Sequence, residues 1–502
     1  MKKPVLLGID AGTSSIKVCA FSLEGELLKR ESASKNIVSR QKGQAELDLN
    51  RYWTSICRCI KSVLADGSLE IMGIGLATTC PTVVCMDEHF EPIGNGIAYL
   101  DNRATLQVTQ YLEKFDDEQT YETLIGNRCS ISTCSCATMA WIRDNEPERW
   151  QKTKHIGMLN SYLAAKLTGN SAIDVTQASY SGIFNLADPT DWNDMLLDKA
   201  GIPRNKLLPV ASPFETVGTV LPLIASDLGI APRTKVAIGS GDTAAAAFAI
   251  NFNDASKAFE SAGTSGVLTY VTDTPRFNSL FMNRCHVFPG KWLSHGANSM
   301  MGGAVDWLRH NIFTEFSEDY HELDKVLRSS TPGANGVVFL PYLAGERCPI
   351  WDTKAKGVWY GLTIQTQKSD MVESVYEAGA FSLKQINDLM QAQIPDRIRE
   401  IVAVGNGTKS AHWCQMKSDV LQVDYKTTNF ADAAAYGAAL VGGIASGIFR
   451  SVFDEAIPFL QPEGTTFFPN KDQQLINCYK KAYETYIALY PALKSIMNRP
   501  ER

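Results

Sequence analysis

The sequence predicts an α/β protein with two related domains, and three observations lead to that prediction. The chain has 502 residues, of which 45% are hydrophobic, and this is more than one compact core usually holds. Short β-prone runs alternate with helical stretches along the chain. A turn with the sequence AGTSS at Ala11–Ser15 returns as AGTSG at Ala262–Gly266, each time between extended segments. Similar turns in both halves indicate two related domains that face one ligand.

The first segment is predicted to be a hairpin. Val5–Ile9 is apolar and β-prone, Gly12–Ser15 is small and polar, and Ile16–Leu23 is again extended. EGE at Glu24–Glu26 predicts the next turn. Later strands are expected at residues 71–77 and 236–239.

Three further segments define the expected organisation. The small apolar stretch Ser240–Ile250 predicts a tightly packed helix, and NFNDA at Asn251–Ala255 breaks that pattern. We therefore expect one domain at residues 1–250 and a second at 251–502. Ala433–Phe449 is rich in Ala and Gly, which predicts a close-packed internal helix rather than a membrane span.

Another helix is expected to begin with Ser369 as its cap. One apolar stripe of this helix is predicted to be core: Val372, Val375, Tyr376, Gly379, Leu383, Ile386 and Met390.

Composition narrows the function classes. The chain has 48 basic and 54 acidic residues without a long basic block, so nucleic acid is not an expected partner. Asp10 interrupts the first apolar run, so we expect a cytoplasmic protein with no membrane segment. The 12 cysteines, including the CxC pairs Cys57/Cys59 and Cys134/Cys136, are expected to be reduced thiols, and the seven histidines show no transition-metal spacing.

The first AGTS turn is a candidate phosphate site. Gly12, Thr13, Ser14 and Ser15 present backbone N–H groups and hydroxyls in a small space. Asp10 precedes them, and a carboxylate there can hold Mg²⁺. The alternative is a polar hairpin with a strand-end Asp. The matching turn at Gly263, Thr264 and Ser265 favours phosphate binding.

Asp242 follows a strand and a Gly-Ser-Gly turn, at the start of a helix. It can be an N-cap, or it can be a general base that accepts the proton of an attacking hydroxyl. The residues alone leave both readings open. Farther along, IVAVGNGTKSAHW predicts a strand, a glycine turn and a helix, which suit one wall of a nucleotide-base pocket.

From about Leu6 to Phe449, these segments resemble the FGGY family of carbohydrate kinases. The most specific part runs from Gly357 through Gly361 and Leu362 to Asp370, Ser374 and Glu377, where the spacing agrees with the second signature of the family. The resemblance implies two ribonuclease H-like domains of the actin, hexokinase and Hsp70 type, with a cleft between them and ATP and Mg²⁺ as cofactors.

The resemblance also implies residue roles. Asp10 would lie near the metal and Asp242 would be the catalytic base, next to the metal and the acceptor, with Thr243 beside it. The nucleotide would contact residues from both halves: Thr13, Ser14, Lys17, Gly263, Thr264, Ser265, Gly302, Asp306, Gly405, Asn406 and Gly407.

On the acceptor side, the resemblance implies contacts by Thr79, Cys80, Asp101 and Arg103. Typical xylulokinases carry a Met-His pair where this chain has Thr79, Cys80 and Pro81, and the first signature has Thr138 in place of a lysine while it keeps Trp141. The expected acceptor is a pentulose, with gluconate or a polyol of the erythritol or glycerol type as alternatives, and a homodimer is expected.

Two proteins of other classes remain as alternatives. An actin-like ATPase switch shares the phosphate turns but lacks the Gly357–Glu377 signature. A sugar-binding regulator without catalysis would not need Asp10, Asp242 and both turns.

Overall fold

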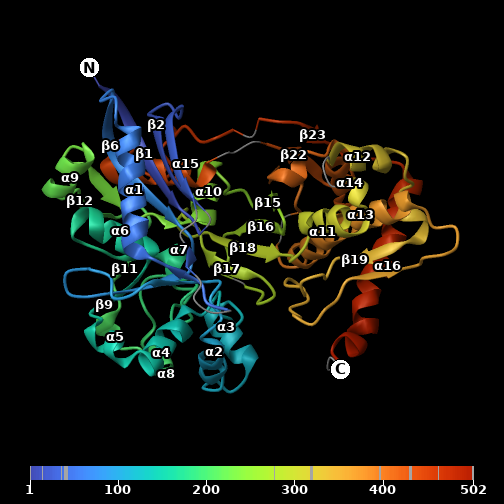
Figure 1. The fold of residues 1–502 in the computed structure, drawn as a ribbon, viewed down its shortest axis with the longest axis horizontal. Helices are drawn as coiled ribbons and strands as arrows, with labels where there is room; N and C mark the ends of the chain where they lie inside the picture. Colours follow the sequence, from blue (N-terminus) through green and yellow to red (C-terminus); the bar gives the residue numbers. More distant parts are fainter. Residues whose placement is uncertain are drawn as a thin grey trace. The chain divides into compact units, whose positions relative to one another are not determined.

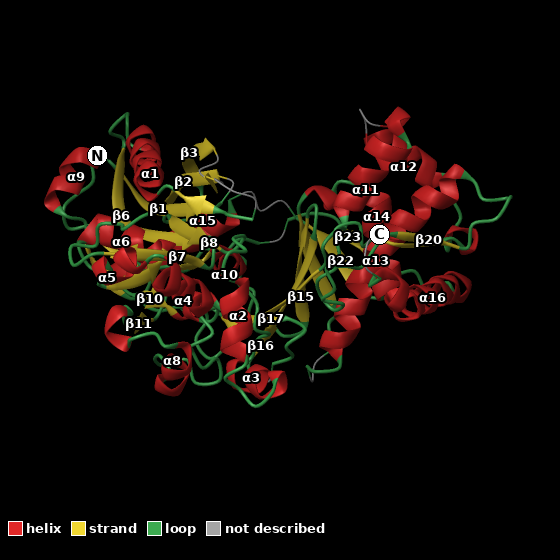
Figure 2. Cartoon of the chain, turned by 60° about the horizontal axis from the view of Figure 1, so that its bottom comes forward, coloured by secondary structure: helices red, strands yellow, loops and turns green. Residues whose placement is uncertain are grey.

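The computed structural model describes residues 2–13, 15–34, 37–38, 43–275, 277–316, 320–394, 397–428, 432–461 and 463–499. The chain divides into two compact units, each of which combines sheets with helices (Figure 2). The first contains Met1–Asn253, Asp273–Leu293 and Ala431–Gln461; the second contains Asp254–Thr272, Ser294–Phe430 and Pro462–Arg502. The predicted domain boundary at residue 250 lies close to the end of the first segment of unit one. A single boundary there leaves out Asp273–Leu293 and Ala431–Gln461, which also belong to the first unit.

The first unit is organised around a mixed sheet. Its strands are hydrogen-bonded in the order β12-β13-β6-β1-β2-β3, and β14 also pairs with β6. Strand β1 is antiparallel to β2 and parallel to β6, which is in turn parallel to β13 and β14. The strands are β1 (Lys3–Ala11), β2 (Ser15–Ser22), β3 (Leu27–Ser34), β6 (Leu69–Thr78), β12 (Thr216–Thr219), β13 (Lys235–Ala237) and β14 (Ser240–Gly241).

The predicted first hairpin is present as β1 and β2, and the turn at Glu24–Glu26 connects β2 to β3. Gly25 supplies the left-handed backbone of that turn, with a φ of 95°. Side chains alternate across β1 because successive residues of a strand point to opposite faces. Val5, Leu7 and Ile9 belong to the main core of the unit.

Helices cover both faces of this sheet (Figure 1). Helix α1 (Leu49–Val63) contributes Tyr52 and Ile56 to the core beside Val5 and Leu7, whereas α15 (Ala433–Ser446) packs against β1 and β6. The other helices of the unit are α2 (Thr105–Leu112), α3 (Glu118–Ile125), α4 (Ser135–Asn145), α5 (Pro147–Lys152), α6 (Leu159–Thr168), α7 (Val175–Ala178), α8 (Asp194–Ala200), α9 (Pro222–Leu228) and α10 (Asp242–Ala249).

Helix α15 approaches the sheet backbone to backbone, because glycines line the contact. A Cβ on Gly8 of β1 would lie 1.8 Å from the carbonyl oxygen of Ala435, and one on Gly75 of β6 would lie 1.8 Å from that of Ala438. From the helix side, a Cβ on Gly437 would lie 1.9 Å from the carbonyl oxygen of Ala245 in α10. The predicted close-packed internal helix is confirmed. No helix in the described ranges is long and apolar enough to cross a membrane.

A smaller sheet lies in the same unit, with the strand order β4-β5-β8-β7-β9. Its strands are β4 (Ile37–Val38), β5 (Glu46–Leu47), β7 (Thr82–Met86), β8 (Gly96–Ala98) and β9 (His155–Met158). The short strands β10 (Ile173–Asp174) and β11 (Val210–Ala211) pair with each other, and β17 (Met282–Cys285) contacts α7.

The second unit repeats the strand arrangement of the first. Its sheet runs β18-β16-β15-β21-β22-β23, where β15 is antiparallel to β16 and parallel to β21. Strand β22 is parallel to β21 and antiparallel to β23. The AGTS turns therefore join equivalent strand pairs in the two units. The strands are β15 (Lys257–Ala262), β16 (Gly266–Thr272), β18 (Trp292–Ala297), β21 (Glu400–Val404), β22 (Asp424–Thr427) and β23 (Thr466–Phe467).

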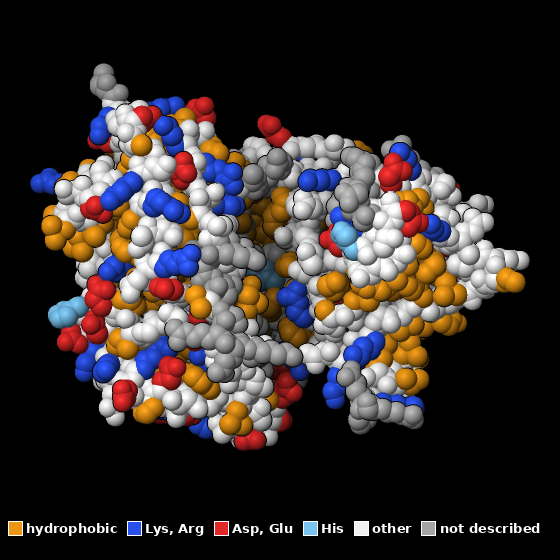
Figure 3. All heavy atoms as spheres, viewed as in Figure 1, with side chains coloured by type: hydrophobic (Ala, Val, Ile, Leu, Met, Phe, Trp, Pro, Cys, Tyr) orange, Lys and Arg blue, Asp and Glu red, His pale blue; other side chains and the backbone are white. Residues whose placement is uncertain are grey.

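Helix α13 (Lys368–Gln391) forms much of the second core, and its predicted apolar stripe is buried. The expectation that Ser369 caps this helix is wrong. Gln367 is the N-cap, and Asp370 accepts a hydrogen bond from the Gln367 backbone N–H at 2.8 Å. The other α-helices and strands of the unit are α11 (Gly302–Trp307), α12 (Tyr320–Arg328), α14 (Ala411–Leu421), α16 (Gln473–Met497), β19 (Val338–Leu340) and β20 (Val358–Tyr360). On the face seen in Figure 3, basic and acidic side chains are interspersed.

Candidate active site

Asp10 and Asp242 lie at the same edge of the first sheet. Asp10 pairs with Ala77 of β6, and the next residue of β6, Thr78, pairs with Gly241 of β14. Because β1, β6 and β14 are parallel, their carboxyl ends meet at one edge, which is where ligands bind to many α/β sheets. The structure therefore brings together the two carboxylates that the sequence singled out.

Asp242 is the first residue of α10, and its N-cap is Gly241. The side chain of Asp242 accepts hydrogen bonds from the backbone N–H and the hydroxyl of Thr243, at 2.6 and 3.2 Å. Burial raises the pKa of Asp242, and Arg284 and the Thr243 hydrogen bonds oppose that rise. A half-buried carboxylate with a raised pKa holds a proton more readily than a solvent-exposed carboxylate does, which suits a general base.

Asp10 is held in a cluster of charges. Burial and the nearby Asp242 carboxylate raise its pKa to about 7, although the ammonium of Lys17 opposes that rise. Lys17 Nζ lies 3.9 Å from Asp10 Oδ2 and 3.2 Å from Asp432 Oδ1. Arg30 Nε lies 3.1 Å from the other oxygen of Asp432. Lys17 is thus shared between two carboxylates beside the first AGTS turn.

A backbone hydrogen bond closes the first AGTS turn. The N–H of Gly12 donates to the carbonyl of Ser15 at 3.0 Å, and the carbonyl of Gly12 accepts from the hydroxyl of Tyr52 at 2.8 Å. Thr13 is half-buried, and Ser14 lies outside the described residues. The turn is therefore anchored to α1 at a point close to Asp10.

Two predicted acceptor residues follow β6 at the same sheet edge. Thr79 is buried and donates its N–H to the carbonyl of Ala11 at 3.1 Å. Cys80 is next in the chain, and burial raises the pKa of its thiol to about 12. Both residues lie near the ends of β1 and β14, as does Thr243.

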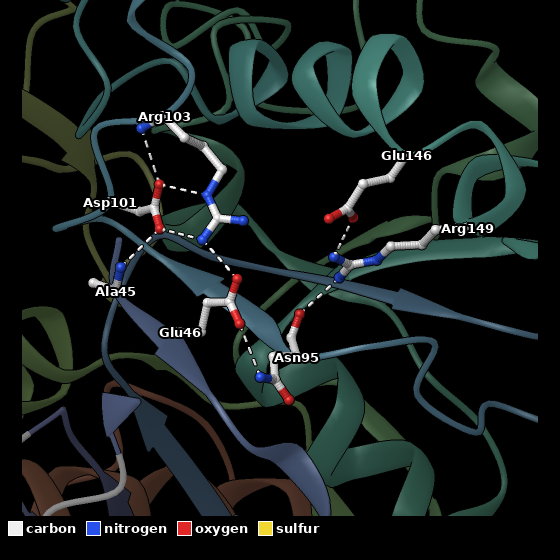
Figure 4. A network of polar contacts seen from close by, with 7 residues as sticks. All are labelled: Ala45, Glu46, Asn95, Asp101, Arg103, Glu146 and Arg149. Carbon is white, nitrogen blue, oxygen red and sulfur yellow. Dashed lines mark hydrogen bonds and ion pairs between the residues drawn. The ribbon is translucent and has the colours of Figure 1, made fainter. Parts of the chain in front are cut away.

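Asp101 and Arg103 form a separate network near the smaller sheet (Figure 4). Arg103 donates from Nε and Nη2 to the two oxygens of Asp101, at 2.8 and 2.7 Å, and from Nη2 to Glu46 at 2.6 Å. Asp101 also accepts from the backbone N–H of Ala45 at 2.7 Å. Arg103 lies over the ring of Trp141, 4.9 Å from its centroid. Within the described residues, none of the hydrogen bonds or ion pairs of Asp101 and Arg103 reaches Asp10 or Asp242.

In the second unit, the turn at Gly263, Thr264 and Ser265 supports the start of α11. The carbonyl of Gly263 accepts from the N–H of Gly302 at 3.1 Å, and the carbonyl of Thr264 accepts from Gly303 at 2.9 Å. A Cβ on Gly302 would lie 2.5 Å from the carbonyl oxygen of Gly263, so glycine is required for this approach. The Asp306 side chain, later in α11, pairs with Arg309 at 3.3 Å.

The predicted adenosine segment also lies against this turn. Gly405 has a φ of 105°, and a Cβ there would lie 2.4 Å from the carbonyl oxygen of Ala262. A Cβ on Gly407 would lie 3.0 Å from that of Ala262, and Asn406 is between the two glycines. The second unit therefore gathers the glycines of its three predicted nucleotide segments, at residues 263, 302, 405 and 407.

Comparison with known families accounts for this arrangement. Residues 5–249 match the N-terminal domain of the FGGY family of carbohydrate kinases, and residues 258–446 match its C-terminal domain. The chain belongs to this family. As an FGGY carbohydrate kinase it is an enzyme of sugar phosphorylation, and its fold is the actin- and hexokinase-like fold of that family.

Individual relatives of this FGGY kinase are distant but match along its whole length. It is 26% identical to a xylulose kinase of Staphylococcus epidermidis, over 99% of this chain and 98% of the relative. It is also 26% identical to a gluconokinase of Bacillus subtilis, over 88% of each chain. The crystal structure of a xylulose kinase from Rhodospirillum rubrum superposes with a TM-score of 0.91 at 23% identity, covering 99% and 100% of the two chains.

Sequence reasoning missed two charged residues of this FGGY kinase. One is Asp432, which forms an ion pair with Lys17. Its position just before the Gly- and Ala-rich helix α15 was a signal that its carboxylate lies at the end of a helix. Arg284 lies in β17 and is only 3% exposed, yet no periodic pattern in the segment FMNRCHVF indicates that an arginine there is buried.

Proposed function

We propose that this chain transfers the γ-phosphoryl group of ATP to a hydroxyl of a small sugar, with a pentulose as the acceptor. The observation that carries the proposal is the pair of carboxylates, Asp10 and Asp242, at the ends of neighbouring parallel strands. Relatives named xylulose kinase, such as the one from Staphylococcus epidermidis, support the choice of a pentulose. The gluconokinase relative makes gluconate the second candidate.

Asp242 is the proposed general base. Its carboxylate accepts two hydrogen bonds from Thr243, which fix its orientation at the start of α10. The acceptor hydroxyl would donate its proton to Asp242 as the oxygen attacks phosphorus. Thr79, Cys80 and Thr243, at the same sheet edge, are proposed to contact the acceptor.

The donor set of Asp10 and Asp242 fits Mg²⁺. The Asp242 carboxylate raises the pKa of Asp10, and two neighbouring carboxylates are the oxygen ligands that a hard cation prefers. Bound Mg²⁺ would offset negative charge on the phosphate oxygens. Lys17 supplies a further positive charge, and Thr13 is proposed to donate hydrogen bonds to phosphate oxygens, as is Ser14, which lies outside the described residues.

In the second unit, the turn of Gly263, Thr264 and Ser265 is proposed to bind nucleotide phosphate through its backbone and hydroxyls. Gly302 and Asp306 in α11, and Gly405, Asn406 and Gly407 after β21, are proposed to contact the rest of the nucleotide. Glycine at residues 302 and 405 is already required by the close packing of these segments.

Asp101 and Arg103 are also proposed to contact the acceptor. Their charges are largely satisfied by each other, by Glu46 and by the backbone of Ala45. A sugar that binds them would therefore do so through remaining lone pairs and N–H groups rather than by forming a new ion pair.

A coupled assay of ADP release tests the function. The panel contains D-xylulose, D-ribulose, D-gluconate, glycerol and erythritol, each with ATP and Mg²⁺. We expect one acceptor class to stimulate ADP release well above the rate with ATP alone, and a pentulose to be the best acceptor. Absence of stimulation by every acceptor would contradict the kinase proposal and favour an ATPase switch or a regulator. Size-exclusion chromatography of the same preparation tests the expected homodimer.

A further inference from the structure

Arg284 is a buried cation whose hydrogen-bonding groups are not fully used. Its side chain extends from β17 in the first unit and is 3% exposed. Within the described part of the chain, its buried Nε and Nη1 atoms have no hydrogen-bond partner. Leaving a buried charged donor unsatisfied is costly, so such groups commonly serve a ligand.

The guanidinium is directed towards the start of α10. A Cβ built on Gly241 would lie 2.7 Å from Arg284 Nη1, so a larger residue immediately before Asp242 would displace the guanidinium. Arg284 also lowers the pKa of Asp242, which places the two charges within electrostatic range of each other. The cation and the proposed base therefore share one end of the first sheet.

Neighbouring residues fix the position of the guanidinium. It lies over the ring of Tyr180, with Cζ 4.3 Å from the ring centroid. Helix α7 contacts both β14 and β17, and the N–H of Gly241 donates to the Thr176 hydroxyl of α7 at 2.8 Å. Gln177, also in α7, donates to Thr78 while its Oε1 atom is buried without a partner. A rigid aromatic face and a fixed helix start therefore hold Arg284 in a defined orientation.

We propose that Arg284 is a specificity-determining residue, which binds a carbonyl or carboxylate oxygen of the acceptor. This inference rests on the proposed kinase function. A guanidinium has only donors, and a carbonyl or carboxylate oxygen has only lone pairs, so the two are fully complementary. An alditol has a hydroxyl where the ketose has its carbonyl, and the O–H of that hydroxyl needs an acceptor that the guanidinium cannot provide.

The inference separates acceptors that the family resemblance leaves open. Ketoses and aldonates carry the required oxygen, and alditols of the same length do not. A site with buried donors discriminates strongly against an acceptor that leaves those donors unpaired. We therefore expect D-xylulose and D-ribulose, or D-gluconate, to be preferred over xylitol, ribitol and D-glucitol.

The test compares kcat/KM for matched pairs of acceptors in the full chain. The wild type is expected to prefer the ketose or the aldonate to its alditol by at least about 100-fold. Arg284→Met is expected to lower kcat/KM for the preferred acceptor by about 10- to 100-fold, with a much smaller change for the alditol. Arg284→Lys, which keeps the charge but loses the planar donors, is expected to restore only part of the preference. If the ketose is preferred but the aldonate is not, the oxygen is a carbonyl, and the reverse result identifies a carboxylate.

Arg149→Met is the matched control. Arg149 is a largely buried arginine of the same unit, and like Arg284 it has a buried Nε atom without a hydrogen-bond partner among the described residues. The hydrogen bonds of its other nitrogens in the described part of the chain go to Glu146 and the Asn95 carbonyl, neither of which is a proposed site residue. We expect that variant to keep the wild-type acceptor preference. Equal use of ketose and alditol by the wild type would overturn the inference even if the Arg284 variants do not fold. An equal loss of kcat/KM for both acceptors in Arg284→Met would also overturn the inference about Arg284. In that case the remaining kinase activity would still support the proposed function. If no acceptor stimulates ADP release, the proposed function itself fails.

Discussion

The ammonium of Lys17 lies 3.2 Å from the carboxylate of Asp432, which joins the second strand of the chain to the start of α15. The Asp432 side chain is 7% exposed and that of Lys17 is 25% exposed, so solvent screens this pair only in part. Arg30 also pairs with Asp432, but the Arg30 side chain is 48% exposed. The two ion pairs of one carboxylate should therefore differ in strength.

Double-mutant cycles can measure that difference. We expect a coupling free energy of about 1 kcal/mol or more between Lys17→Met and Asp432→Asn, and less than about 0.5 kcal/mol between Arg30→Met and Asp432→Asn. Asn tolerates the left-handed backbone at residue 432, where φ is 71°, so the substitution removes charge with little strain. Urea unfolding of each variant gives the energies. Equal couplings for both pairs would contradict the importance of burial here.

Asp242→Asn should lower turnover by at least about 100-fold, because the amide cannot accept the proton of the acceptor hydroxyl. The amide oxygen can still accept the hydrogen bond from the Thr243 N–H, so the start of α10 should keep its structure. The coupled ADP assay measures turnover, and thermal unfolding checks the fold. Turnover within threefold of the wild-type value would exclude Asp242 as the base.

Gly8→Ala should destabilise the first unit by about 3 kcal/mol or more, because the new Cβ would overlap the carbonyl oxygen of Ala435. Gly447→Ala is the control. Gly447 has a φ of 86° with no atom within 4 Å of an added Cβ, so only backbone strain of about 1–2 kcal/mol is expected there. The midpoints of urea unfolding report both changes, and a smaller loss in Gly8→Ala than in Gly447→Ala would contradict the packing argument.

Glu346→Gln should stabilise the protein more at pH 8 than at pH 5. Burial raises the pKa of Glu346 to about 7, although its Oε1 atom accepts from the N–H groups of Ser299 and Arg347. Since the folded state holds this proton more tightly than the unfolded state, the contribution of Glu346 to stability is greatest below about pH 4.5. It is lost as the pH rises to about 7, by an amount on the order of 3 kcal/mol.

Gln keeps the Oε1 acceptor and removes the charge of Glu346, whose Oε2 atom has no hydrogen-bond partner among the described residues. Urea unfolding of the wild type and of Glu346→Gln at pH 5 and pH 8 measures the effect. If the stability difference between the two proteins is the same at both pH values, Glu346 does not titrate between them.

Local patterns predicted much of this structure. The polar turn at Gly12 to Ser15, between two β-prone runs, was enough to predict the first hairpin, and its copy at Gly263 predicted the equivalent hairpin of the second unit. The Ala- and Gly-rich composition of α15 predicted close packing. These features are determined by residues that are close together in the chain, so a single sequence is enough to predict them.

Contacts between distant segments could not be predicted in the same way. Nothing near Asp432 in the sequence points to Lys17, and nothing near Arg284 points to Tyr180 or Gly241. Asp101 and Arg103 were predicted as acceptor contacts, but their sequence does not reveal that Glu46 and Ala45 occupy much of their hydrogen-bonding capacity. The start of α13 was also mispredicted, although the residues involved are close in the sequence. The helix begins after Gln367 rather than Ser369, because the side chain of Asp370 accepts a hydrogen bond from the Gln367 backbone N–H.

The glycine-lined face of β1 and β6 stays uncovered during synthesis until the ribosome has released α15, which is encoded near the end of the chain. The nascent N-terminal segment would therefore expose an apolar, flat surface for most of translation. A chaperone that shields such surfaces should associate with ribosome-bound chains that end before residue 433 and dissociate once residue 446 has emerged.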